Sequence, residues 1–198
     1  MISIDPQHNT ERDNYKLLVG SIIPRPIAFV TTLGDEEVLN GAPFSYFNIV
    51  SSNPPMISVS IQHAASGQSK DTARNIKHTK EFVVHIVDQQ NVGQVNMTAA
   101  PLPPDQSEVS LAGLTPVDSL HIGVPGIKEA KVRMECVLEH CLELPNNDLI
   151  IGRIVQFHID EKIYEQGRID PVQLGAVSRL AGNHYAGIGE IFEIERPV

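Results

Sequence analysis

The chain has 198 residues, which is enough for one domain with a substantial hydrophobic core. A formal net charge of -9 and a pI near 5.3 argue against nucleic acid as the main partner, because phosphate backbones are bound by clustered Lys and Arg. No stretch approaches the roughly 20 apolar residues of a membrane span, and the first residues lack a signal-peptide pattern. We expect a single domain over residues 1–198 that is cytoplasmic, with no membrane partner.

The two cysteines, Cys136 and Cys141, fall within one expected strand. Side chains alternate along a strand, so these two are expected on opposite faces, which predicts no disulfide between them. Free thiols fit a reducing cytoplasm.

The first expected strand covers residues 27–32, where β-branched and aromatic residues follow Pro24 and Pro26. Residues 1–20 are polar and predict a lead-in segment that packs on the main body. Arg25 lies between the two prolines, which hold it on an extended backbone. It is interpreted either as a solvated edge residue or as a contact to a phosphate or a polar ring edge.

The stretch NGAPFSYFN, residues 40–48, follows an expected turn at Gly34-Asp35. Its simplest interpretation is a β-hairpin with an ordinary loop. The alternative is a backbone that lies against a flat ligand, since Gly41 and Ala42 permit a close approach and Pro43 stiffens the loop.

Residues 56–62 alternate in the manner of a strand and lead into a polar loop. Ser69 or Asp71 is expected to be the N-cap of a short helix that begins in the stretch KDTARNI. Free N–H groups beside Lys70 and Thr72 would suit an anion. Simple capping with surface charges is the alternative.

Residues 81–87 predict a central strand that is apolar on both faces. His85 within it is interpreted as a core histidine with hydrogen-bond partners rather than as a ligand. Helices are expected over residues 89–100 and 105–111, separated by a proline-rich loop, with a long irregular connection to residue 126.

Residues 130–144 and 149–159 carry the longest strand signals, and the Asn and Asp residues between them predict a tight β-hairpin. The chain then becomes polar and glycine-rich. Residues 188–194 predict a short final strand.

Three other classes of site are disfavoured by the sequence. A metal site at Cys136, His140, Cys141 and His158 conflicts with strand alternation, which puts the first two roughly 13 Å apart at about 3.3 Å per residue. Hydrolysis lacks a Gly-x-Ser-x-Gly elbow, and no base lies beside Ser45 or Ser178 in sequence. The glycine-rich residues 182–189 precede a strand-like run rather than the helix of a Rossmann unit.

Five motifs occur in a fixed order: PRPIAFVTT, NGAPFSYFN, SSNPPMISVSIQ, KDTARNI and SRLAGNHY. In this order the sequence resembles the flavin reductase-like family of FMN-binding split β-barrels, which includes flavoredoxin-type proteins. The resemblance extends from residue 24 to residue 185. It implies a mainly β, antiparallel, Greek-key-like split barrel with a few short helices, which binds FMN noncovalently near a homodimer interface.

The resemblance also assigns parts of the FMN to motifs. The loop at residues 42–45 would line the ring edge, residues 70–72 would hold the phosphate, and the last motif would close over the flavin from this or the partner subunit. The implied FMN-binding residues are Arg25, Thr31, Ala42, Pro43, Phe44, Ser45, Ser60, Lys70, Asp71, Thr72, Arg179 and Tyr185.

The implied activity is an NAD(P)H-dependent FMN oxidoreductase, in which NADH or NADPH passes hydride to flavin N5. Electrons then go to a small-molecule or protein acceptor. This chemistry needs no metal and no protein acid or base. One alternative is an FMN-binding electron carrier that a partner protein reduces. Another is a pyridoxamine phosphate oxidase-type enzyme, which would need a pocket rich in Arg, Lys and His that the sequence does not reveal.

Overall fold

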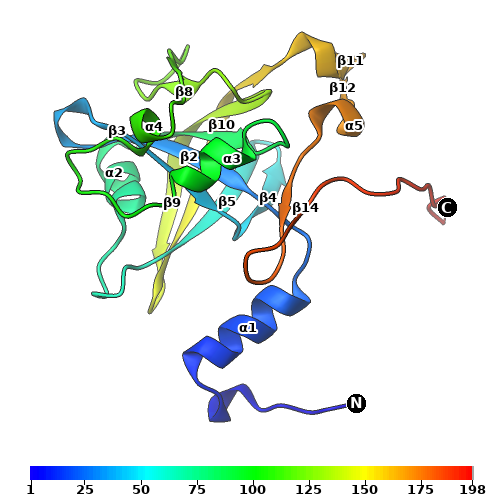
Figure 1. The fold of residues 1–198 in the computed structure, drawn as a ribbon. Coiled ribbons are helices and arrows are strands. Elements are labelled where there is room, and N and C mark those ends of the chain that lie inside the picture. Colours follow the sequence, from blue (N-terminus) through cyan, green and yellow to red (C-terminus); the bar gives the residue numbers. More distant parts are fainter. Residues whose placement is uncertain (198) are drawn as a thin grey trace.

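A seven-stranded antiparallel sheet forms the centre of the computed structural model, which describes residues 1–197 (Figure 1). The order across the sheet is β3 (Leu39–Phe44), β2 (Ala28–Leu33), β6 (Glu81–Ile86), β9 (Val132–Glu143), β10 (Asn147–Ile159), β5 (Pro55–Gln62) and β4 (Phe47–Ser52). The expected mainly β, antiparallel architecture is therefore confirmed.

The two edge strands of this sheet, β3 and β4, are joined by only two residues, Ser45 and Tyr46. The sheet must therefore curl until its edges meet at this corner. The N–H of Ser60 on β5 donates to the Tyr46 carbonyl at 2.8 Å, which fixes the corner against the next strand. Residues 40–48, expected as a loop, are therefore two strands and a short corner.

The inside of the curled sheet holds one hydrophobic core. Ala28 and Val30 point inward from β2, and Phe82 and Val84 point inward from β6; all four are fully buried. Helix α2 (Asp71–Thr79) packs against β2 and buries its own apolar face in the same core. Full burial of a Val, Ile or Phe side chain contributes roughly 1.5–3 kcal/mol.

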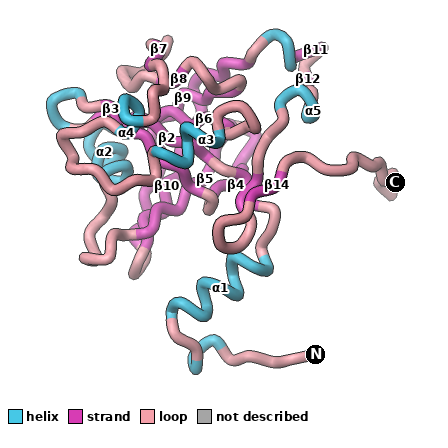
Figure 2. Tube along the Cα trace, viewed as in Figure 1, coloured by secondary structure: helices cyan, strands magenta, loops and turns pink. Residues whose placement is uncertain are grey.

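A second core lies on the outer face of the same strands. Phe29 of β2 packs there with residues of α3 (Val92–Met97), α4 (Glu108–Leu111) and β8 (Gly126–Ile127). Figure 2 shows α3 and α4 as cyan coils in front of the magenta sheet. Because both faces of the sheet are covered here, the sequences of β2 and β6 are nearly continuous apolar runs.

Shorter elements complete the described chain. They are η1 (Pro6–His8), β1 (Arg25–Pro26), η2 (Asp35–Glu37), β7 (Pro116–Val117), η3 (Glu161–Ile163), β11 (Tyr164–Glu165), β12 (Arg168–Ile169), α5 (Pro171–Leu174), β13 (Ser178–Arg179) and β14 (Tyr185–Ala186). No helix within residues 1–197 is both long and apolar enough to span a bilayer.

The expected hairpin of β9 and β10 is confirmed, but a bulge at Glu139 changes which side chains share a face. His140 pairs with Ile151, whereas Leu138 pairs with Gly152, so one residue of β9 is extra. Cys136 pairs with Ile154 and Cys141 with Ile150, and both cysteines pack against the inner core. The expectation that the two thiols point to opposite faces was wrong, and both are free.

The two ends of the chain differ from expectation. Residues 11–21 form the helix α1 (Glu11–Ser21), which buries only Val19 and projects from the barrel rather than packing closely on it (Figure 1). The predicted final strand at residues 188–194 is an exposed extended tail without strand pairing. The helix expected at residues 89–100 is limited to α3, and the one at 105–111 to α4.

The start of α2 also differs from expectation. Its N-cap is Lys70, which provides no side-chain capping bond, while Asp71 is already the first helical residue. The Ser69 hydroxyl donates instead to Asp148 at 2.6 Å. The N–H groups of the first turn are thus left without a side-chain cap.

His85 is a core histidine, as predicted. Its ring is 1% exposed, its Nδ1 lies 2.9 Å from the Phe29 carbonyl, and its Nε2 accepts from the Ile127 N–H at 3.0 Å. These partners require a proton on Nδ1 only, which is the neutral ring. Burial lowers the pKa of His85 to about 3.

We expect His85 to weaken the fold in acid. The unfolded chain binds a proton at this residue below pH about 6.5 and the folded chain does not, so the unfolding free energy falls by about 1.4 kcal/mol per pH unit from this residue alone. The loss extends down to the folded pKa near 3. Urea unfolding of wild type and His85→Gln across this range should give a shallower slope for the variant. Parallel slopes would contradict the assignment.

Gly152 on β10 faces the ring of Phe82, and an added Cβ would collide with that ring. We expect Gly152→Ala to lower the unfolding free energy by about 1–3 kcal/mol, because the core cannot give way there. Gly93→Ala is the matched control, since nothing lies within 4 Å of its added Cβ. Urea midpoints should fall for the first variant alone; an equal effect of both would refute tight packing at Gly152.

Candidate functional site

Two neighbouring cavities open at the corner between β3 and β4. The larger, about 480 Å³, lies between β3, the start of α2 and residues 98–104. The smaller, about 210 Å³, lies between the corner, α3 and the β13–β14 hairpin. Both are lined by Pro43, Phe44 and Ala99, so we describe them as one cleft that crosses the end of β3.

The start of α2 forms the polar end of the cleft. Lys70, Asp71 and Thr72 all line the larger cavity. Asp71 forms an ion pair with Arg74, which lines the same cavity, whereas the Lys70 side chain is exposed. The first turn presents N–H groups without a side-chain cap. This end of the cleft therefore favours an anion.

A buried hydrogen-bond network lies beneath the polar end. The Asn40 Oδ1 accepts from the hydroxyls of Thr72 at 3.0 Å and Thr32 at 3.2 Å. Its Nδ2 donates to Glu108 at 3.0 Å, and the Gly41 N–H donates to the same carboxylate oxygen at 3.4 Å. The hydroxyl proton of Thr72 is thus already used within the protein.

Glu108 is a buried acid beside a site that favours an anion. It is 7% exposed, and burial raises its pKa, an effect that the charge of Asp71 increases and the bonds from Gly41 and Asn40 oppose. A raised pKa means that the charged form of this acid is disfavoured here relative to a solvated glutamate.

Apolar side chains form the walls of the cleft. Ala42, Pro43 and Phe44 contribute one wall, and the segment at residues 99–104 contributes the facing one. Gly41 is turned away from the cleft, because its added Cβ would lie 2.7 Å from both Phe29 and Val109. Gly41 was expected to admit a flat ligand, but it makes a contact within the protein instead. The absence of a side chain at Gly41 lets β3 pack between β2 and α4.

The β13–β14 hairpin borders the smaller cavity. The Arg179 guanidinium lies 4.5 Å from the centre of the Tyr185 ring and donates to the Gly182 carbonyl at 2.7 Å. The Tyr185 hydroxyl donates to Asn96 on α3 at 3.0 Å. Ser45 lines the same cavity at the corner. The last motif and the β3 corner are thus brought together.

Three of the predicted site residues are used elsewhere. Arg25 is 6% exposed and donates to the carbonyls of Val19 at 2.8 Å and Leu180 at 2.9 Å, so it is neither solvated nor free. The Thr31 hydroxyl donates to the Pro125 carbonyl at 2.7 Å, and Ser60 accepts from Asn147 at 3.0 Å. None of the three lines the cleft, although Arg25 lies 3.5 Å from the Ser45 hydroxyl.

The sequence did not identify Asn40, Glu108 or the wall at residues 99–104 as parts of the site. Asn40 could have been identified, because a polar residue in a sheet that is buried on both faces needs buried hydrogen-bond partners. Glu108 carried no such signal, because its partner Asn40 is 68 residues away.

The flavin reductase like domain family model matches residues 19–173. A solved structure, nitrilotriacetate monooxygenase component B from Bacillus cereus, is 58% identical, with a TM-score of 0.96 and 98% of each chain covered. The 2-nitrobenzoate 2-nitroreductase NbaA of Pseudomonas fluorescens is 28% identical, with a TM-score of 0.91 over 99% of this chain and 96% of the other. A flavin reductase with a split barrel domain from Shewanella frigidimarina NCIMB 400, described as putative in its name, shares 20% identity, full coverage of both chains and a TM-score of 0.86.

These matches cover most of the chain and agree with the curled sheet described above. The chain belongs to the flavin reductase-like family, and its fold is the split barrel. Both the expected family and the expected fold class are confirmed.

Glu108→Gln should separate the charge of this residue from its hydrogen bonds. Both bonds use one carboxylate oxygen, so a glutamine oxygen can accept them without a charge. Because the folded pKa is raised, wild type loses stability as pH rises from about 4.5 through that value. We expect the variant to be the more stable form at pH about 8 and the two to converge near pH 4. Equal stability at both pH values would show that Glu108 is not electrostatically strained.

Proposed function

We propose that the chain binds FMN noncovalently in this cleft and is an NAD(P)H-dependent oxidoreductase. The observation that carries the proposal is the cleft itself, which has apolar walls and an anion-favouring end in a flavin reductase-like fold. Bound FMN would supply two-electron chemistry, taking hydride from NADH or NADPH at N5 and passing electrons to an acceptor. The whole chain acts as one such domain.

The residues fit the parts of this cofactor. The walls at Pro43 and Phe44 would exclude water from the isoalloxazine ring, and corner residues such as Ser45 would bond its edge. Lys70 and the N–H groups of the first turn of α2 would bind the phosphate through charge-assisted hydrogen bonds. Asp71 is paired with Arg74, which reduces its repulsion of that phosphate.

The chain's own contribution to catalysis is orientation and electrostatics. Arg179 and Tyr185, stacked on each other, would hold the cofactor on the side of the smaller cavity. Hydride transfer needs no protein proton donor. The protein would therefore accelerate it by excluding water and by holding the hydride donor at the correct distance from the flavin. Arg25 then acts indirectly, since it ties the β1 segment to the last motif.

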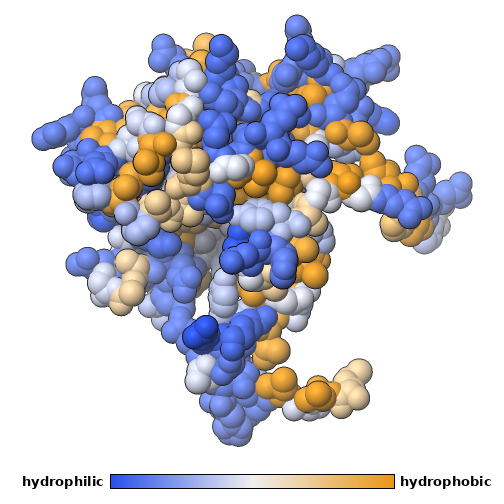
Figure 3. Space-filling view, in the orientation of Figure 1, coloured by the Kyte–Doolittle hydropathy of each residue, from blue (hydrophilic) through white to orange (hydrophobic). Residues whose placement is uncertain are grey.

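We further propose a cytoplasmic homodimer. Several large apolar side chains are exposed on β4, at the end of α1 and on the C-terminal tail: Ile49 at 77%, Ile22 at 61% and Phe192 at 74%. Figure 3 shows such side chains along the projecting N-terminal and C-terminal segments. Exposed apolar surface on this scale is typical of an interface, and a second copy would cover it. The free cysteines support a reducing compartment.

The alternative is an FMN-binding carrier that another protein reduces. The Bacillus cereus relative is named as component B of a monooxygenase, which supports a separate protein as electron acceptor or donor. Either way, the partner takes or delivers electrons through the cleft.

The deciding experiment begins with the visible spectrum of the purified protein. We expect a yellow protein, or one that turns yellow with added FMN, and release of FMN on denaturation. Anaerobic titration with NADH and NADPH should then bleach the flavin absorbance. A flavin that both coenzymes leave oxidised would favour the carrier, and failure to take up FMN would end the proposal.

Lys70→Ala should weaken FMN binding by about tenfold to hundredfold, because one charge-assisted hydrogen bond contributes about 1.5–3 kcal/mol, while riboflavin binding should not change. Lys162→Ala is the control, since it removes an exposed cation from η3, which lines neither cavity. Fluorescence titration of both flavins provides the dissociation constants. An equal loss for FMN and riboflavin would move the phosphate away from α2.

A further inference from the structure

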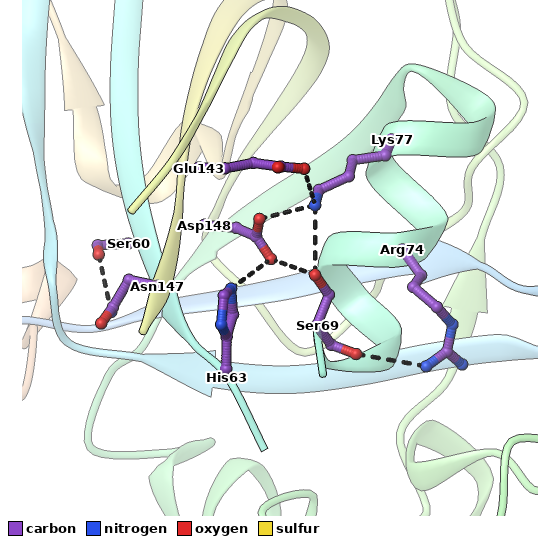
Figure 4. Close-up of polar contacts among 8 residues, drawn as sticks. All are labelled: Ser60, His63, Ser69, Arg74, Lys77, Glu143, Asn147 and Asp148. Atoms are coloured by element: carbon purple, nitrogen blue, oxygen red, sulfur yellow. Dashed lines mark hydrogen bonds and ion pairs between the residues drawn. The ribbon is translucent and has the colours of Figure 1, made fainter. Parts of the chain in front are cut away.

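The first residues of β10 bury a carboxylate where three segments meet. The Asp148 side chain is 1% exposed and accepts a hydrogen bond from the Ser69 hydroxyl at 2.6 Å. The Lys77 ammonium lies 2.7 Å and the His63 Nε2 3.3 Å from its oxygens, at ion-pair distance. Figure 4 shows these groups pointing at the two carboxylate oxygens from the loop before α2, from α2 itself and from the end of β5. Lys77 also contacts the Ser69 oxygen at 3.2 Å and Glu143 at 3.0 Å.

This carboxylate is held in its charged form. Burial alone would raise the pKa of Asp148, but the hydrogen bonds from Lys77 and Ser69, with the charges of Lys77 and His63, bring it below its usual value. A buried charge is tolerated only where such partners surround it, so removal of the charge releases all three.

The three groups do not form a hydrolytic triad. Ser69 and His63 both contact the same carboxylate, and within the described residues no hydrogen bond joins the two side chains. A serine nucleophile needs the imidazole as its direct base, and here the hydroxyl donates its hydrogen bond to the aspartate instead. The arrangement fixes position rather than activating a nucleophile.

What it positions is the polar end of the cleft. Ser69 directly precedes Lys70, Asp71 and Thr72, and all four line the larger cavity. Within the preceding loop, residues 65–68 are exposed, and the backbone bonds there close only a local turn between Ala64 and Gln68. The Ser69 hydroxyl donates to Asp148 and accepts from Lys77, and Lys70 at the N-cap position provides no side-chain bond, so the first N–H groups of α2 have no side-chain cap.

We propose that Asp148 is a positioning residue that gives the cleft its preference for a phosphorylated flavin over riboflavin. The inference rests on the proposed FMN site. Asp148 holds the Ser69–Thr72 backbone in its binding conformation before the ligand arrives, so that the phosphate meets N–H groups that are already aligned. Loss of its charge frees the loop and leaves the apolar walls, which bind the ring, intact.

The test compares dissociation constants of FMN and riboflavin for wild type, Asp148→Asn, Ser69→Ala and the control Asp170→Asn. The control removes the charge of an Asp that caps the remote helix α5. We expect Asp148→Asn to weaken FMN by about tenfold or more, Ser69→Ala to act in the same direction, and riboflavin and the control to stay unchanged. Thermal unfolding of each apoprotein verifies folding, and Ser69→Ala, which keeps the Asp148–Lys77 pair, decides the question should Asp148→Asn not fold.

The outcomes separate this inference from the proposed function. Wild type that does not bind FMN overturns the function. Suppose instead that wild type prefers FMN and that Lys70→Ala lowers this preference. If the FMN-to-riboflavin affinity ratio is then unchanged in both Asp148→Asn and Ser69→Ala, the positioning role alone is overturned. A lower ratio in Ser69→Ala supports it, because a merely structural change would weaken both flavins equally.

Discussion

The short link between β3 and β4 is the constraint on which the rest of the structure depends. Two residues cannot cross an open seven-stranded sheet, so the edge strands must meet. The curl that results creates the inner core and also places Pro43, Phe44 and Ser45 at a corner that lines a cavity. Unlike a flat sheet, this geometry produces a concave site from backbone that is already rigid, which suits a planar ligand.

The second core connects the fold to the site. Phe29 and Gly41 bring β2, β3 and α4 into contact, and α4 carries Glu108 to the floor of the cleft. The proline-rich residues 99–104 lie between α3 and α4, both of which are anchored in that core, so they form a wall without regular structure of their own. The position of the wall is therefore set by the two helices that hold its ends.

The sequence predicted the parts of this molecule that depend on local chemistry. Alternation and turn residues identified the β9–β10 hairpin, and the buried setting of His85 followed from an apolar strand. The bulge at Glu139 was not visible, because it is decided by pairing across two strands rather than by one residue type, and it reversed the placement of Cys141. The role of Asp148 was not predicted for a similar reason. It contacts residues from three segments that come together only in the closed barrel.

An acidic chain with a net charge of -9 can still favour an anion, provided that its nearby acids are already compensated. Around the cleft this is so for each acid in a different way. Asp71 is paired with Arg74, Asp148 is paired with Lys77, and Glu108 accepts hydrogen bonds from Asn40 and Gly41. Lys70 and the uncapped N–H groups of α2 then determine the local potential, because nearby charges and dipoles outweigh distant ones screened by water. Net charge alone therefore carried no information about the sign of this cleft.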